Sequence, residues 1–335
     1  MNPTAGALLR DGLVTLPESV ADVQEVRTLG GERVIQLRLL DGLALDLRPD
    51  HGLDLGAAWW RGVPIAWRSP HRVDPGPGHD WEQRFLGGLL VTCGPENIGP
   101  PTATAGQHGS HHHTPATEVR WWRAEVGDEV EVHVSGVIGH TTLYGTRLTV
   151  HREVVTRTGR ARVEVRDVIR NDGNAPVGVP LLYHVNLSAP LLAPDARLVL
   201  DGSDGPVTTQ LREPLPPGRD PLSMPDPSCT ADAVVAEHRA VRADPDGRSR
   251  AVLEPAAGPR VVVDWTAPTL PRLCTWAWPE RGAWVLGVEP TNAPLFGPER
   301  DGPFGGAPVL GPGEEWRTAV AVEIVPAGAG QEEHG

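Results

Sequence analysis

The feature that most constrains this chain is the alternation of apolar and polar residues in many short stretches. Examples are "EVEVHVSGV" from Glu129 and "ARVEVRDVI" from Ala161. Side chains of a β-strand point alternately to opposite faces of a sheet, so a period of two predicts strands with one buried face. Such stretches predict strands at residues 33–39, 43–49, 129–137, 146–154, 161–169, 197–202, 260–266, 283–289 and 317–325.

Turn-forming residues separate these stretches. The chain has 35 prolines and 39 glycines, which favour short elements joined by turns. Only residues 17–27, "PESVADVQEVR", show a helical period with a proline near the start, and they predict a short surface helix. Many strands without intervening amphipathic helices predict an all-β fold: a large antiparallel β-sandwich with few short helices.

The length of the chain bounds its domain organisation. A chain of 335 residues can bury a large core. We expect an N-terminal extension with a short helix at 1–29, a single sandwich domain at 30–326 and a flexible tail at 327–335. Residues 69–117 and 201–250 interrupt the strand rhythm, and loops of that length are usually functional or mobile.

Charge and cysteine content exclude several classes of protein. The formal net charge is −13, whereas nucleic acid and anionic membranes attract basic surfaces, so neither is expected as a partner. Cys93, Cys229 and Cys274 are far apart and indicate neither a disulfide framework nor a zinc site. With no leader-like start and no apolar run of membrane-spanning length, we expect a cytoplasmic protein.

Chemistry in this chain must come from dispersed residues. The sequence contains no G-x-S-x-G, P-loop, G-x-G-x-x-G or H-E-x-x-H motif. Three segments instead place a titratable residue in an apolar or glycine-rich setting. They contain His108 ("QHGSHHHTPA"), His184 ("LLYHVNLSAPLL") and Glu289 ("WVLGVEPTN").

The residues alone leave two interpretations open for each of these groups. Glu289 precedes Pro290, which tends to end a strand, and partial burial there would raise the carboxyl pKa from about 4.3 towards that of a useful base. A solvated strand-end glutamate is the commoner case. His184 has a side chain suited to proton transfer near neutral pH, but a histidine in an apolar run is often a core residue.

The run His111, His112, His113 suggests a metal site only weakly. Consecutive residues of an extended chain point to opposite sides, so at most two could face one ion, and no acidic or cysteine ligand is near in sequence. We therefore predict a solvated loop and no metal ligands.

Tryptophans are unusually frequent, at eleven beside two tyrosines. Indole faces stack on sugars as well as filling cores. We expect Trp59, Trp60, Trp265 and Trp284 to be core residues. The cleft candidates are Trp81, Trp276 and Trp278, which lie beside the polar segments.

Taken in order on an all-β chain, these segments resemble the aldose 1-epimerase (galactose mutarotase-like) family, and most closely its little-characterised bacterial branch. The resemblance runs through "LRPDHGLDLGAAWWRGVPIAWRSP", "FLGGLLVTCGPENIGPP", "HGSHHHTPA", "LLYHVNLSAPLL", "VLGVEPTN" and "LGPGEEW". It covers most of residues 30–325.

The resemblance implies roles for individual residues. His184 would be the general acid and Glu289 the general base. The implied substrate-binding residues are His108, Arg84 and Asn97, to which we add the cleft candidates Asn186 and Trp276. The family's sugar-binding aspartate has no assigned counterpart among Asp220, Asp226 and Asp264.

The implied function is an isomerase that interconverts sugar anomers by acid–base ring opening and closure, without metal or organic cofactor. Ser110 and His51 stand where relatives commonly carry arginine, so the resemblance does not define the sugar or its charge. The alternatives are a non-catalytic sugar-binding protein, an isomerase for a keto or acidic sugar, and a lyase or isomerase with a metal at the three histidines.

Overall fold

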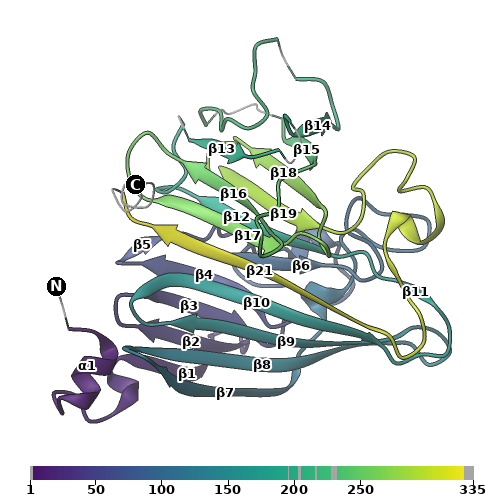
Figure 1. The fold of residues 1–335 in the computed structure, drawn as a ribbon. Helices are drawn as coiled ribbons and strands as arrows, with labels where there is room; N and C mark the ends of the chain where they lie inside the picture. Colours follow the sequence, from purple (N-terminus) through teal and green to yellow (C-terminus); the bar gives the residue numbers. More distant parts are fainter. Residues whose placement is uncertain (1–2, 195, 203–204, 216, 228–231, 328–335) are drawn as a thin grey trace.

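In a computed structural model that describes residues 3–194, 196–202, 205–215, 217–227 and 232–327, two large antiparallel sheets pack face to face (Figure 1). The predicted all-β sandwich is confirmed. Each of the nine alternating stretches forms a strand or the greater part of one.

Within the described residues, the first sheet has 11 strands in the order β1-β2-β3-β4-β6-β12-β19-β18-β15-β14, with β5 paired to β4. Its strands are β1 (Ala21–Arg27), β2 (Arg33–Leu39), β3 (Leu43–Arg48), β4 (Asp54–Trp60), β5 (Val63–Pro64), β6 (Leu90–Cys93), β12 (Leu182–Ser188), β14 (Thr208–Leu211), β15 (Val234–Arg239), β18 (Arg272–Trp278) and β19 (Val285–Thr291).

The second sheet has eight strands among the same residues, in the order β13-β16-β17-β21-β10-β9-β8-β7. They are β7 (Thr117–Val126), β8 (Glu129–Thr141), β9 (Arg147–Arg157), β10 (Arg160–Asn171), β13 (Arg197–Leu200), β16 (Arg248–Glu254), β17 (Arg260–Thr266) and β21 (Glu315–Val325). A separate pair joins β11 (Val177–Gly178) to β20 (Val309–Leu310).

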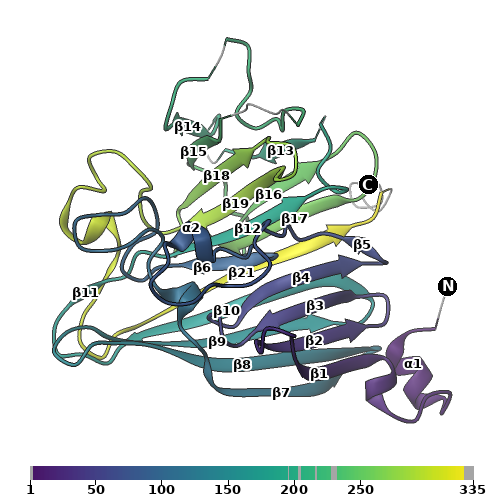
Figure 2. The same ribbon diagram turned by 180° about the vertical axis from the view of Figure 1, so that it is seen from behind.

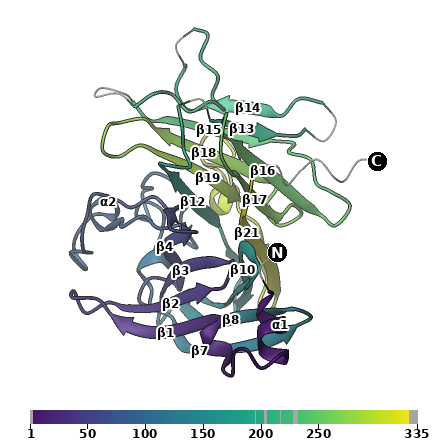
Figure 3. The ribbon, with the colours of Figure 1, turned by 90° about the vertical axis from the view of Figure 1, so that its left-hand side faces the viewer.

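Helices in the described residues are short. Two are α-helical, α1 (Ala5–Arg10) and α2 (Trp81–Arg84), and three are single turns of 3₁₀ helix, η1 (Pro17–Ser19), η2 (His111–His113) and η3 (Pro303–Gly306). Figures 2 and 3 show α2 on the outer face of the first sheet, on the side away from the second sheet. None of the helices in the described ranges is long and apolar enough to cross a membrane.

The core lies between the two sheets and follows the alternation of the strands. On β8, Val130, Val132 and Val134 are fully buried while the residues between them are partly exposed. They belong to one cluster with the buried leucines of β3, such as Leu45 and Leu47. Burying apolar side chains on both inner faces is what holds the layers together.

The predicted helix at residues 17–27 is wrong. Only Pro17–Ser19 is helical, as η1, and Ala21–Arg27 forms β1, the edge strand of the first sheet. Valines at positions 20, 23 and 26 imitate a helical period, but Ala21 and Val23 are the buried pair and β1 pairs with β2 along its whole length. Pairing with an existing strand outweighs a weak local preference.

The two segments that interrupt the strand rhythm differ in structure. Residues 69–117 place α2 on the outer face of the first sheet, supply β6 as one of its strands and continue into η2. The described parts of 201–250 add β14 and β15 to the end of that sheet. Cys93 and Cys274 are buried and unpaired. Cys229 and residues 328–335 of the expected tail lie outside the described residues.

Candidate active site

Strand geometry places His184 and Glu289 on the outer face of the first sheet. On β12, the hydroxyl of Tyr183 points between the sheets and donates to Asp167 of β10 at 2.6 Å, so His184 points outwards. On β19, Val288 belongs to the core between the sheets and Glu289 points the other way. The two strands are neighbours in the sheet.

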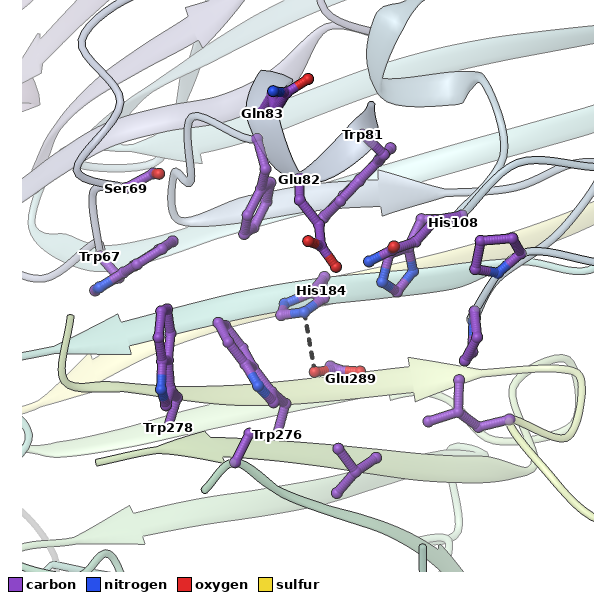
Figure 4. A pocket seen from close by; sticks show the side chains of 18 of the residues that line it. Trp67, Ser69, Trp81, Glu82, Gln83, His108, His184, Trp276, Trp278 and Glu289 are labelled. Atoms are coloured by element: carbon purple, nitrogen blue, oxygen red, sulfur yellow. Dashed lines mark ion pairs between the residues drawn. The ribbon is translucent and has the colours of Figure 1, made fainter. Parts of the chain in front are cut away.

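The two side chains lie at a cavity of about 770 Å³ that the segment 69–117 covers (Figure 4). Its aromatic lining is Trp67, Trp81, Phe85, Trp276 and Trp278. Its polar lining includes Glu82, Gln83, His108, His184, Arg212 and Glu289. Aromatic walls with a few convergent polar groups are typical of a small-molecule site.

The predicted acid and base are in contact in the cavity. Nε2 of His184 lies 3.1 Å from Oε1 of Glu289, and the residues are 4% and 3% exposed. Oε1 of Glu289 and Nδ1 of His184 nevertheless have no hydrogen-bond partner in the described structure. Gly287 makes room for this contact, because a Cβ there would overlap Oε1 and lie 3.0 Å from Cε1 of His184.

Burial determines the protonation of this pair. It raises the pKa of Glu289 to about 8, and no donor or positive charge among the described residues offsets that rise. Burial, helped by the nearby His108, lowers the pKa of His184 to about 3. Between these values the pair holds one proton, and in the free cavity that proton resides on Glu289.

Pro290 does not end the strand, as the sequence had suggested. β19 continues to Thr291, and its register with β12 is the same on both sides of the proline: Leu182 faces Thr291 and Val185 faces Val288. The ladder is interrupted only between these pairs, where Pro290 has no N–H to donate. Glu289 is therefore a buried residue within a strand.

His108 and Trp81 form one wall of the cavity. Nδ1 of His108 contacts the carbonyl of Ile98 at 2.9 Å, and the ring lies 4.4 Å from Trp81 and 6.1 Å from His184, centroid to centroid. With Nδ1 donating to that carbonyl, Nε2 keeps its lone pair. Trp276 lies on the other side, 5.5 Å from the His184 ring.

Three other predicted substrate contacts do not line this cavity. Arg84 makes two hydrogen bonds to Asp74, at 2.8 and 2.7 Å. The amide of Asn97 donates to three backbone carbonyls of its own loop, and the amide of Asn186 donates to the carbonyls of Gly88 and His184. These asparagines position the wall and the strand.

None of the unassigned aspartates Asp220, Asp226 and Asp264 lines the cavity. Asp264 lies on β17 of the second sheet, where Arg162 and Arg248 contact it.

The prediction of a solvated loop at residues 111–113 is wrong. His111 and His112 are each 1% exposed, and Nδ1 of His112 lies 2.8 Å from Oδ2 of Asp54. The polar run suggested solvent because sequence alone does not reveal a buried carboxylate on a distant strand.

Beneath the cavity floor lies a buried ionic network between the sheets. Arg152 of β9 donates to Asp54 at 2.7 Å and to both oxygens of Asp167 at 2.9 and 2.7 Å. Thr92 and Tyr183 donate to the same two carboxylates. Burial alone would raise the pKa of Asp54, but the bond from His112 and the charge of Arg152 lower it below its ordinary value.

Sequence reasoning missed Trp67, Phe85 and Glu82, which also line the cavity. Figure 4 shows the carboxylate of Glu82 pointing from α2 towards His184. No motif marks these residues. Phe85 and Glu82 share one signal, their position in the segment 69–117 that interrupts the strand rhythm, whereas Trp67 lies just before it.

Comparisons with known proteins agree with this fold. Residues 30–324 match a family model described as a domain of unknown function, DUF4432. No protein with a curated functional assignment matches the sequence. A candidate aldose 1-epimerase from Klebsiella pneumoniae is 21% identical with a TM-score of 0.79, over 90% of this chain and 83% of that one.

Two further solved structures are similar. A galactose mutarotase-like protein from Clostridium acetobutylicum is 15% identical with a TM-score of 0.63, over 92% of this chain and 99% of that one. A candidate mutarotase from Salmonella typhimurium is 12% identical with a TM-score of 0.62, over 91% and 94%. At these identities the likeness establishes a galactose mutarotase-like fold.

Proposed function

The chain belongs to the DUF4432 family, and from that premise we propose that it is an aldose 1-epimerase-like isomerase that interconverts the anomers of a sugar. The observation that carries the proposal is the 3.1 Å contact between His184 and Glu289 in an aromatic cavity. The fold shared with proteins named as mutarotases supports it.

Anomer exchange needs one base and one acid on a single ring. A carboxylate at Glu289 takes the proton of the anomeric hydroxyl while an imidazolium at His184 protonates the ring oxygen, and the ring C–O bond breaks to give the open-chain aldehyde. Rotation about the first carbon–carbon bond presents the other face of the carbonyl. Closure reverses both transfers and restores the starting protonation.

The proton count of the free site fits this cycle. Ring opening moves one proton onto Glu289 and one off His184. While the sugar is in its open-chain form, the site therefore holds a neutral glutamic acid and a neutral imidazole. Burial favours that same neutral state in the free cavity. On this proposal, sugar hydroxyl groups that donate to the carboxylate restore the ionic state in the complex.

A non-catalytic sugar-binding protein is the second candidate. It would bind a sugar without changing the rate of anomeric exchange. The unpartnered atoms of His184 and Glu289 argue against it, because leaving buried polar groups unpaired costs free energy that binding alone does not require.

The decisive experiment compares wild type with Glu289→Gln and His184→Asn by NMR exchange spectroscopy on a panel of aldoses. The panel includes uronic acids, because Arg212 lines the cavity. Loss of either group is expected to lower the exchange rate by about 10²-fold or more, the scale of a positioned acid or base. Sugar binding, followed by quenching of the cavity tryptophans, should change little.

Glu254→Gln is the matched control, because Glu254 ends β16 in the second sheet and is exposed. It should exchange anomers at the wild-type rate. Sugar binding by wild type without any acceleration over the uncatalysed rate would instead favour the binding protein, and wild-type rates in Glu289→Gln would end the proposed mechanism.

A further inference from the structure

A cluster of three histidines lies behind the cavity wall. His112 and His113 come from η2, and His51 comes from the turn between β3 and β4. One ring nitrogen from each lies within 4.8 Å of the others. His51 and His112 are buried and the His113 side chain is 11% exposed.

Several nitrogens of this cluster lack partners. Nε2 of His112 is buried with no hydrogen-bond partner among the described residues, and so are both ring nitrogens of His113. A buried polar group without a partner is destabilising. Because a neutral imidazole ring offers one lone pair, His112 and His113 present two such nitrogens to a ligand that accepts lone pairs.

The Nδ1 atoms of His112 and His51 have the hydrogen-bond partners that are common for histidine ligands of metals. Nδ1 of His112 lies 2.8 Å from Oδ2 of Asp54, which leaves its lone pair on Nε2. Nδ1 of His51 lies 3.2 Å from the carbonyl of His112. Histidine ligands commonly donate their second N–H to a carboxylate or a backbone carbonyl in this way, which fixes both the tautomer and the ring orientation.

The charge around the cluster also suits a cation. Asp54 belongs to the buried network, in which two carboxylates face the single guanidinium of Arg152. Within the described ranges, the second carboxylate of that network, Asp167, makes an ion pair with Arg152 alone. Positive charge bound at His112 would offset the excess negative charge through Asp54.

We propose that His51, His112 and His113 bind a divalent transition-metal ion of the zinc class. Imidazole nitrogens suit zinc and its first-row neighbours, and three histidines leave one coordination position open. His113 also lines a second cavity of about 620 Å³, which gives the ion a route to the site. Small rotations of the rings would bring the nitrogens to coordination distance.

This ion would stabilise the cavity wall and would not take part in the reaction of the proposed isomerase. Phe85 stands between the two sites, with its ring centre 6.3 Å from that of His112 and 5.8 Å from that of His184. By joining η2 to the turn before β4, the ion would fix the loop that carries His108. The inference does not depend on the proposed function.

The test is a metal titration of tag-free protein after dialysis against a chelator. Calorimetry with Zn²⁺ and the visible absorption of bound Co²⁺ should both show one equivalent of tight binding. His113→Gln should weaken the affinity by more than about 100-fold, beyond the loss typical of an outer-shell partner. His113 is the ligand of choice because its ring makes no hydrogen bond that folding would lose.

Two variants serve as controls. His151→Gln removes an exposed histidine of β9 and should bind as wild type does. Glu289→Gln, which tests the isomerase, should also bind normally, so the two proposals can fail separately. If His113→Gln does not fold, His51→Gln replaces it. Absence of stoichiometric binding to wild type, or an equal loss in His151→Gln, would overturn the inference.

Discussion

Two carboxylates buried in this molecule behave in opposite ways. Asp54, between the sheets, is 0% exposed and receives bonds from Arg152, Thr92 and His112. Burial raises its pKa, but the bond from His112 and the charge of Arg152 outweigh burial and lower it. Glu289, on the other face of the first sheet, is 3% exposed, and no described residue donates a hydrogen bond to its Oε1. Burial raises its pKa to about 8. Burial raises the pKa of both carboxyls, and the partners of Asp54 reverse that rise.

This contrast distinguishes two regions, the Arg152 network between the sheets and the candidate active site around Glu289. In the Arg152 network nearly every hydrogen-bonding atom is paired, so a change there should act on stability. At Glu289 the pairing is incomplete, which keeps a proton available at the cost of some stability. Three measurements test this distinction.

The largest effect is expected from breaking the network. Arg152→Met leaves Asp54 and Asp167 buried without their cation and should lower the free energy of unfolding by about 3–5 kcal/mol, measured by urea denaturation. Arg317→Met is the control, because its pair with Glu315 is exposed, and it should change stability by less than about 0.5 kcal/mol. Similar losses in both variants would contradict a special role for the network.

The next effect has the opposite sign: replacing Glu289 by glutamine should raise stability relative to wild type as the pH increases. Its pKa is raised from 4.5 to about 8 in the folded protein, so between these values the folded state holds a proton that the unfolded chain has lost. Wild-type stability therefore falls as the pH rises through this window, and the loss is complete above about pH 8.

Glu289→Gln does not titrate, so its stability relative to wild type should rise by up to about 4 kcal/mol between pH 5 and pH 9. Glu315→Gln, at an exposed position of β21, should show no such trend. A constant difference across the range would show that the Glu289 pKa is not raised.

The smallest change expected is in the pH profile of anomeric exchange. The pair carries its single proton between the pKa values of about 3 and about 8, so kcat/KM should be level near neutrality and fall about tenfold per pH unit above pH 8. Exchange NMR from pH 5 to 10, corrected for the uncatalysed rate, measures this. A rate that still rises through pH 9 would mean that the fully deprotonated pair is active.

Much of the buried network could have been predicted from the sequence. On β9, Leu148, Val150, Arg152 and Val154 share one phase of the alternation, so Arg152 occupies a core position. On β10, Asp167 occupies the same phase as Val163 and Val165. Opposite charges at core-facing positions of adjacent strands indicate a buried ion pair.

The candidate catalytic pair, His184 and Glu289, was predictable in a different way. His184 and Glu289 stood out as polar residues in apolar strands, but their distance depends on the pairing of β12 with β19, strands about a hundred positions apart in the chain. The burial of His112 depends on Asp54 and the loop path above β6. The local pattern shows which residues of a strand face the core, whereas these contacts depend on how distant segments pack together.

The opposed directions of Tyr183 and His184 on β12 tie the two regions together. A slip of this strand by one residue would exchange them, sending the phenol into the cavity and the imidazole against Asp167. An insertion or deletion in the turn before β12 should therefore abolish reactivity and folding at once. The register of β12 therefore fixes both the position of His184 at the cavity and the packing of Tyr183 between the sheets.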